Sequence, residues 1–430
     1  MTKQPAGKQW SRLDNAAKIF PSNSTLRDPK VFRFSCQLTD EVDPAALQQA
    51  LDKTLPAFPH YRSVLRRGLF WYFLEQSELP AVVEEEHLPL CSPLYDRDRR
   101  GLLFRVMYYR RRISAEVYHA LSDGSGALQF LRTLLHHYLL IVHADELGDS
   151  PPALDYDASL WQKLDDSFAR HYQGAPQREQ HASAVSTAKR AYRLQGPKLS
   201  EYRLRLIEGS MPVEPLLALA RSHGTTLTVL LGAVLVEAIH DCMPKRMEKL
   251  PVILSIPVNL RTYFESQSAR NFFGLFYAGY SFDDGSSELN DIIAALGDCF
   301  RRELVPEQLA LRMNKLAALE RNLFTRFIPL VLKDITLRIF GRRTEHQMTA
   351  AFSNLGRITM PQPLAQYIET FAVCSSTNKI QLCLSTFNDR LTVTITEPFQ
   401  HSGVPMRFFR RLNELGAQIT VVSNIQEESR

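Results

Sequence analysis

The sequence predicts an α/β (α+β) sandwich fold with mixed sheets, divided into two lobes. Three observations predict it. The chain has 430 residues, of which 45% are hydrophobic and 23% charged, the balance of a soluble globular protein. Strand-like and helix-like segments alternate in both halves, which is typical of α/β and α+β proteins. A polar stretch without periodicity lies between the halves, so we expect lobes over 1–175 and 191–430 with a crossover linker at 176–190.

The first half has the stronger periodic signals. Alternating apolar residues predict strands, and Asp43-Pro44 predicts a helix start because aspartate caps and proline fits the first turn. Two β-rich runs joined by three arginines predict a hairpin that ends at His119. We expect, in order, a short helix over 10–21 stopped by Pro21, a strand over 31–38, a helix over 44–55, a strand within 61–76, the hairpin over 102–109 and 113–119, and a helix over 127–142.

The second half alternates helices with short apolar runs. The segment 227–239 is apolar nearly all round, which indicates a buried helix. Asn388-Asp389 separates two β-rich runs and indicates a turn between paired strands. We expect helices over 213–222, 227–239, 288–304, 307–319, 323–339 and 406–415, and strands over 252–258, 272–282, 371–374, 380–387 and 391–396.

Charge and cysteine content limit the classes of function. A net charge of +5 is small for this length and does not indicate a nucleic-acid surface. The six cysteines form no CxxC pair, so we expect reduced, mostly buried thiols and no metal site. The first residues lack the apolar core of a signal peptide, and the stretch 227–239 is too short to span a bilayer. These features predict a cytoplasmic protein.

The sharpest local feature is His119-Ala-Leu-Ser-Asp123-Gly124, which lies between a predicted strand and a predicted helix. A histidine held at the end of a strand can project into a cleft and remove a proton from a hydroxyl or an amine. The residues alone also allow a purely structural interpretation. In that case Asp123 caps the helix, Gly124 supplies an unusual backbone angle, and His119 is a core residue.

The motif His119-x-x-x-Asp123-Gly124 resembles the active-site motif of a large acyltransferase superfamily. That superfamily contains chloramphenicol acetyltransferase, the BAHD acyltransferases, nonribosomal-peptide condensation domains and alcohol acetyltransferases. Further segments resemble the alcohol-acetyltransferase group in the same order: Trp10-x-x-Leu13-Asp14-Asn15-Ala16-Ala17-Lys18-Ile19-Phe20-Pro21, then Pro257-Val258-Asn259-Leu260-Arg261 with Asn271-Phe272-Phe273-Gly274, and Ser353-Asn354-Leu355-Gly356. The resemblance spans residues 10–356, nearly the whole chain.

The resemblance implies two chloramphenicol-acetyltransferase-like lobes with a tunnel between them. His119 would be the general base that takes the acceptor's proton as its oxygen attacks a thioester. Asp123, with Gly124 beside it, would support the site by pairing with Arg261. Asn259, Ser353 or Asn354 could stabilise the oxyanion, although such residues also cap turns. The expected donor is acetyl-CoA or another acyl-CoA, the acceptor a small alcohol, and no cofactor is tightly bound.

Two alternatives remain open at this point. The first is a condensation-like enzyme that takes its acyl group from a carrier protein and forms an ester or an amide. Condensation domains usually carry a second histidine where this chain has Tyr118, which argues for a stand-alone acyltransferase. The second is a catalytically silent small-molecule binder. The apolar and basic segment 323–343 could lie on a membrane surface, but Pro329 and Asp334 favour a helix packed on the second lobe, without membrane contact.

Overall fold

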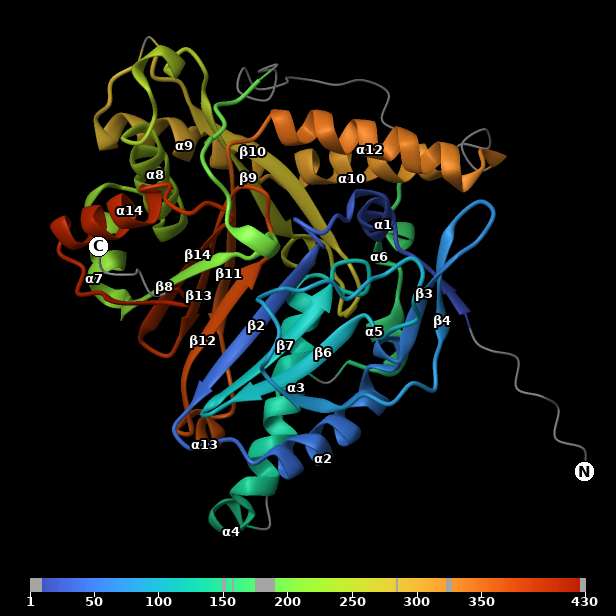
Figure 1. Ribbon diagram of the computed structural model, residues 1–430. Coiled ribbons are helices and arrows are strands. Elements are labelled where there is room, and N and C mark those ends of the chain that lie inside the picture. The colour runs from blue at the N-terminus through green and yellow to red at the C-terminus, as the bar shows by residue number, and fades with distance from the viewer. Residues whose placement is uncertain are drawn as a thin grey trace, which may run out of the picture.

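The computed structural model describes residues 10–148, 152–156, 158–174, 190–283, 285–321 and 327–425. The chain forms two mixed α/β lobes (Figure 1), so the predicted fold class is confirmed. The predicted linker at 176–190 lies almost entirely outside the described residues.

The first lobe is built on a five-stranded sheet of order β12-β2-β7-β6-β5. Its long helices α2 and α3 pack against each other below the sheet in Figure 1. Asp43 caps α2 by accepting hydrogen bonds from the amides of Ala45 and Ala46, as its sequence predicts. The elements are β2 (Val31–Leu38), α2 (Pro44–Thr54), β5 (Val83–Glu85), β6 (Phe104–Tyr109), β7 (Arg112–Tyr118), α3 (Gly124–Val142), α4 (Ala144–Leu147) and β12 (Ile368–Ser375).

The second lobe is built on a seven-stranded sheet of order β10-β9-β11-β13-β14-β8-β15. Helices α7, α8, α9 and α14 cover one face of it (Figure 1), and α8 is buried on nearly every side because its residues are apolar all round. The elements are β8 (Arg205–Pro212), α7 (Val213–Ser222), α8 (Leu227–His240), β9 (Val252–Asn259), β10 (Phe273–Tyr280), α9 (Leu289–Glu303), β11 (Ala350–Ile358), β13 (Ile380–Phe387), β14 (Arg390–Glu397), α14 (Val404–Glu414) and β15 (Thr420–Ser423).

The remaining elements surround the junction of the lobes. A small antiparallel sheet of order β1-β4-β3 lies beside the first lobe. The other elements are β1 (Trp10–Arg12), α1 (Phe20–Asn23), β3 (Ser63–Arg67), β4 (Tyr72–Gln76), α5 (Leu160–Leu164), α6 (Ser167–Arg170), α10 (Pro306–Arg321), α12 (Leu330–His346) and α13 (Gln362–Ala365). The prediction of one helix over 10–21 was wrong: a strand and a short 3-10 turn come first, and Pro21 lies in the first turn of α1 instead of stopping a helix.

Strand β12 belongs to the second half of the chain but pairs with β2 of the first lobe. It also lies against the second sheet, where Ser385 Oγ donates to the Phe371 carbonyl at 2.8 Å and Thr396 Oγ1 to the Ser375 carbonyl at 3.1 Å. These buried hydroxyls satisfy backbone carbonyls that the first-lobe sheet leaves free on that side. The lobes are therefore joined by a shared strand, and the second half is not confined to its own lobe.

Helix α12 differs from its prediction. It begins at Leu330, and residues 323–326 of the predicted helix lie outside the described residues. Its Leu337 carbonyl accepts from Asn23 Nδ2 and its Leu330 amide donates to the Leu69 carbonyl, so α12 contacts segments of the first half. Val331, Leu332 and Ile335 are each about half exposed. The expectation that its apolar residues pack inward was wrong.

Three further sequence predictions concern the cysteines, membrane-spanning helices and metal sites. All six cysteines are free thiols, five of them buried. Among the described residues, no single helix is long and apolar enough to cross a bilayer, and α7 with α8 reaches that length only as a pair bent by 86°. No group of three or more His, Cys, Asp or Glu in the described ranges is placed to hold a metal ion.

Candidate active site

His119 follows directly after β7, the central strand of the first-lobe sheet, and its amide donates to the Lys30 carbonyl at 2.9 Å. Its ring stacks on Phe20, with ring centroids 4.7 Å apart and planes 14° apart, and contacts Phe32 at 4.6 Å. Phe273 of the second lobe lies 6.2 Å away. The aromatic contacts hold the imidazole in one orientation at the junction of the lobes.

The surroundings of His119 favour its neutral form. Burial lowers the pKa of the imidazole to about 4, against a smaller opposing effect of the Asp123 carboxylate. Atom Nδ1 is enclosed and has no hydrogen-bond partner among the described residues, whereas the residue as a whole is only half-buried. A neutral imidazole with one enclosed nitrogen can accept a proton only at Nε2.

Asp123 caps helix α3 and also joins the lobes. Its Oδ1 accepts from the Gly126 amide at 2.9 Å, the N-cap bond that the sequence predicts. Its Oδ2 accepts from Arg261 Nη1 at 2.8 Å and from the Phe272 amide at 2.7 Å. Both carboxylate oxygens are therefore occupied by groups other than the His119 ring.

Arg261 lies in the 3-10 turn that follows β9 and bonds in several directions. Besides Asp123, its guanidinium donates to the carbonyls of Ser268 at 2.9 Å and Arg270 at 2.6 Å. A planar guanidinium has five donors in a fixed fork, which suits this arrangement. Arg261 thereby fixes the loop 268–272 against the start of α3.

The loop 268–272 is itself pressed onto the turn after His119. Ser122 Oγ donates to the Ala269 carbonyl at 2.6 Å, and a Cβ on Gly126 would lie 2.1 Å from that same oxygen. The sequence reasoning did not single out Ser122, Gly126 or Ala269. The one sequence feature that could have indicated them is the short spacing between Arg261 and the Asn271-Phe272 segment, which places the loop 268–272 close to Arg261.

The three candidates for an oxyanion donor lie in different environments. Asn259 Oδ1 accepts from the backbone and guanidinium of Arg261, at 3.1 and 3.2 Å. Ser353 and Asn354 are neighbours on β11, so they point to opposite faces of the sheet. Leu355, on the same face as Ser353, reaches Gly124: a Cβ there would lie 3.3 Å from Leu355 Cδ2. Ser353 therefore faces the first lobe.

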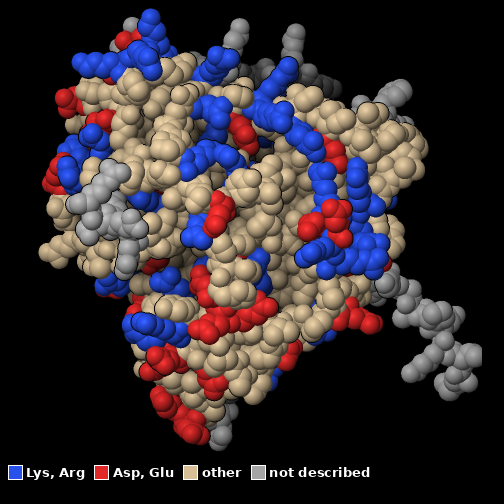
Figure 2. Space-filling view, in the orientation of Figure 1, with Lys and Arg blue, Asp and Glu red and all other residues tan. Residues whose placement is uncertain are grey.

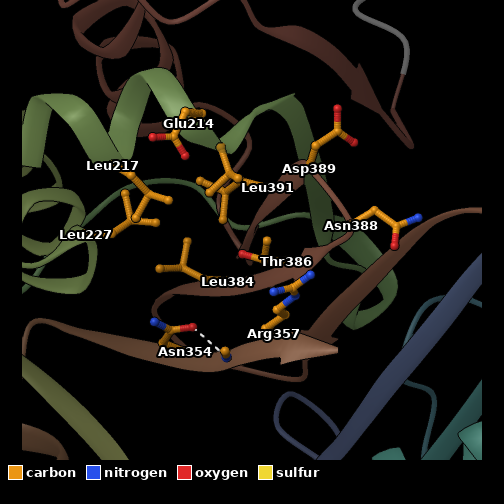
Figure 3. A pocket seen from close by; sticks show the side chains of 12 residues that line it. Glu214, Leu217, Leu227, Asn354, Arg357, Leu384, Thr386, Asn388, Asp389 and Leu391 are labelled. Carbon is orange, nitrogen blue, oxygen red and sulfur yellow. Dashed lines mark hydrogen bonds between the residues drawn. The ribbon is translucent and has the colours of Figure 1, made fainter. Parts of the chain in front are cut away.

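Asn354 faces away from the first lobe, into a cavity of about 470 Å³ (Figure 3). Its Nδ2 donates to Thr228 Oγ1 at 2.8 Å, and its Oδ1 accepts from the Gly356 amide at 2.7 Å. Leu217 and Leu227 border this cavity above, and Leu384 borders it from the sheet. The structure thus brings His119, Asp123, Gly124 and Arg261 together and separates Asn354 from them.

Comparisons with known proteins show which solved structures share this fold. No protein-family model matches the chain, and no curated protein matches it in sequence. Solved structures do match over nearly the whole chain. TRI101 of Fusarium sporotrichioides, solved with coenzyme A and T-2, has a TM-score of 0.65 at 10% identity and covers 96% of this chain and 99% of its own.

Two further structures extend this likeness. TRI3 trichothecene 15-O-acetyltransferase of Fusarium sporotrichioides has a TM-score of 0.61 at 12% identity, with 96% of each chain covered. The first condensation domain of the CDA synthetase has a TM-score of 0.59 at 13% identity, covering 96% of this chain and 97% of its own. The chain has the two-lobed fold that acetyltransferases and condensation domains share, as its motifs predict.

Proposed function

We propose that this protein is an acyltransferase that moves an acetyl or other acyl group from a coenzyme A thioester to an alcohol. The observation that carries the proposal is the neutral, partly accessible His119 ring at the junction of the lobes. Structures of the same fold include a protein named as an O-acetyltransferase and another solved with coenzyme A, which supports this reaction class.

The proposed reaction has two proton transfers. Nε2 of His119 takes the proton of the acceptor hydroxyl as its oxygen bonds to the thioester carbonyl carbon. The tetrahedral intermediate then collapses, the carbon–sulfur bond breaks, and the imidazolium returns the proton to the departing coenzyme A thiolate. No acyl-enzyme forms. Surroundings that lower the pKa of His119 to about 4 keep its imidazole neutral near pH 7, which is the form that can accept a proton.

We expect the positioning of His119 between the two substrates to contribute the rest of the rate acceleration. The Asp123–Arg261 pair holds the turn after His119 against the second lobe, so the base keeps its place between the two substrates. Ser353, on the face of β11 toward the first lobe, is the candidate that we retain for the oxyanion. We assign Asn354 to positioning, because its Nδ2 donates to Thr228 and its Oδ1 accepts from Gly356. We assign Asn259 to capping, because its Oδ1 accepts from the amide and the guanidinium of Arg261.

A carrier-protein donor is the second candidate, favoured by the likeness to a condensation domain. The position before His119 argues against it, since Tyr118 is buried and its hydroxyl bonds to Ser24 Oγ at 2.9 Å. Release of free thiol from acetyl-CoA over a panel of alcohols tests the proposal. Turnover with acetyl-CoA supports it, whereas turnover with an acylated carrier protein alone selects the second candidate.

A further inference from the structure

Helix α12 presents an apolar face to solvent. Its inner side, toward the protein, contains buried Leu330 and Asp334. Its opposite side carries the outer stripe, which we define as Val331, Leu332, Ile335 and Ile339; each is 48–55% exposed. This spacing places the four side chains within an arc of about 100° around the helix.

This orientation reverses that of an ordinary surface helix, which turns its apolar side to the core. Polar contacts hold the inner side instead. Tyr72 donates to the Asp334 carboxylate at 2.8 Å, and Lys333 Nζ donates to the Phe70 carbonyl at 3.0 Å. The Leu69 carbonyl accepts from the Leu330 amide at 2.9 Å, and the Leu69 side chain, near the start of α12, is 73% exposed.

Positive charge borders the outer stripe. Arg338, Arg342 and Arg343 are exposed on α12, and none of them forms an ion pair with a residue that the structure describes. Figure 2 shows Lys and Arg side chains gathered over the upper part of the molecule, where α10 and α12 lie in Figure 1. Apolar side chains flanked by unpaired arginines are the pattern of a helix that lies in a membrane interface.

We propose that α12 lies flat on an anionic lipid surface, with the outer stripe at the boundary of headgroups and acyl chains. Arg338, Arg342 and Arg343 would then contact the anionic headgroups. Charge complementarity is the reason for choosing this occupant over a second copy of this chain, because the exposed arginines on α12 match the negative charge of an anionic lipid surface.

Helix α1 lies between α12 and His119, the proposed base. Asn23 Nδ2 donates to the Leu337 carbonyl at 3.4 Å, and Arg338 Nε to the Ser22 carbonyl at 3.3 Å, so α1 is fastened to α12. Phe20 at the start of α1 stacks on His119. Docking through α12 would place the junction of the lobes beside the bilayer, where an apolar acceptor concentrates.

Flotation of the full chain with lipid vesicles tests the proposal. We expect binding to vesicles of phosphatidylcholine with phosphatidylglycerol, and weaker binding to phosphatidylcholine alone. The double variant Ile335→Glu/Ile339→Glu should bind at least about tenfold more weakly. The matched control Val421→Glu/Val422→Glu changes two equally exposed residues on β15 and should bind within about twofold of the wild type.

The charge is tested by Arg342→Gln/Arg343→Gln, which should weaken binding to anionic vesicles by about tenfold or more and leave thermal unfolding unchanged. If the Ile335→Glu/Ile339→Glu variant fails to fold, vesicle binding by the arginine variant tests the proposal instead. Absence of vesicle binding by the wild type, or equal binding by all variants, would overturn the proposal. So would a dimer in light scattering that the stripe variant dissociates without any vesicle binding. Thiol release with a water-soluble alcohol, measured in parallel, tests the proposed activity separately.

Discussion

Asp123 and Arg261 form an ion pair across the two lobes, with Oδ2 and Nη1 2.8 Å apart and side chains only 5% and 12% exposed. The carboxylate belongs to the N-terminal cap of α3, and the guanidinium to the turn after β9. Because His119 and Asp123 share one short turn, this pair sets the position of the proposed base relative to the second lobe.

Removal of Arg261 should destabilise the protein because it leaves a buried carboxylate without its counter-charge. We expect Arg261→Ala to lower the free energy of unfolding by about 3 kcal/mol. In an Asp123→Asn background the same change should lower it by only about 1 kcal/mol. Urea denaturation of the two single variants and the double variant measures this coupling. Strictly additive losses would show that the pair does not act as a unit.

The depressed pKa of His119 makes stability depend on pH. Below the ordinary histidine pKa of about 6.5 the unfolded chain binds a proton at this position, while the folded chain binds it only near pH 4. The contribution is therefore complete above about pH 6.5 and is lost as pH falls toward 4, to a total of about 3 kcal/mol.

The His119→Gln variant isolates this contribution, since the buried His60, whose pKa burial lowers to about 3, is present in both proteins. The free energy of unfolding of the wild type minus that of His119→Gln should fall as pH decreases from 7 to 4. Urea titrations at each pH provide both values. A difference that stays constant with pH would contradict the assigned environment of His119.

Two glycines in the same turn should respond differently to a methyl group. In Gly126→Ala the Cβ would lie 2.1 Å from the Ala269 carbonyl oxygen, so backbone must shift, and we expect a loss of about 3 kcal/mol. In Gly124→Ala the contact is Leu355 Cδ2 at 3.3 Å, a flexible side-chain end, and the loss should stay below about 1 kcal/mol. Thermal unfolding of both variants measures the contrast; equal losses would show that the loop 268–272 is not tightly packed here.

Strand alternation on β11 separates Ser353, the retained oxyanion candidate, from Asn354. Ser353→Ala should lower kcat by about a hundredfold if its hydroxyl stabilises the oxyanion. Asn354→Ala should change kcat by less than about threefold, because its amide is bonded to Thr228 and Gly356 on the other face. Steady-state thiol release gives both values. The reverse order of effects would exchange the two roles.

Local signals predicted most of the long helices and most strands, and the resemblance implied the pairing of Asp123 with Arg261 that the structure contains. The strands over Val31–Leu38 and Ile380–Phe387 have their predicted bounds because their apolar pattern is uninterrupted. Strand β11 was missed because Asn354 and Gly356 are typical of turns, although parallel neighbours on both sides hold it extended.

Long-range relationships could not be predicted from local pattern. The pairing of β12 with β2 joins residues more than 300 positions apart, and nothing in 368–375 specifies its partner. The stacking of Phe20 on His119 depends on the same tertiary arrangement. Likewise, the apolar residues of α12 predict a helix but not the side that faces solvent.

In the proposed reaction, His119 is the proton acceptor in acyl transfer from coenzyme A. The most direct measurement is the single-turnover rate of thiol release from acetyl-CoA with an accepted alcohol, in the wild type and in His119→Ala, at pH 7.5. We expect a rate at least about a hundredfold lower in His119→Ala, with an unchanged unfolding midpoint at neutral pH as the control. Equal rates in two folded proteins would contradict it.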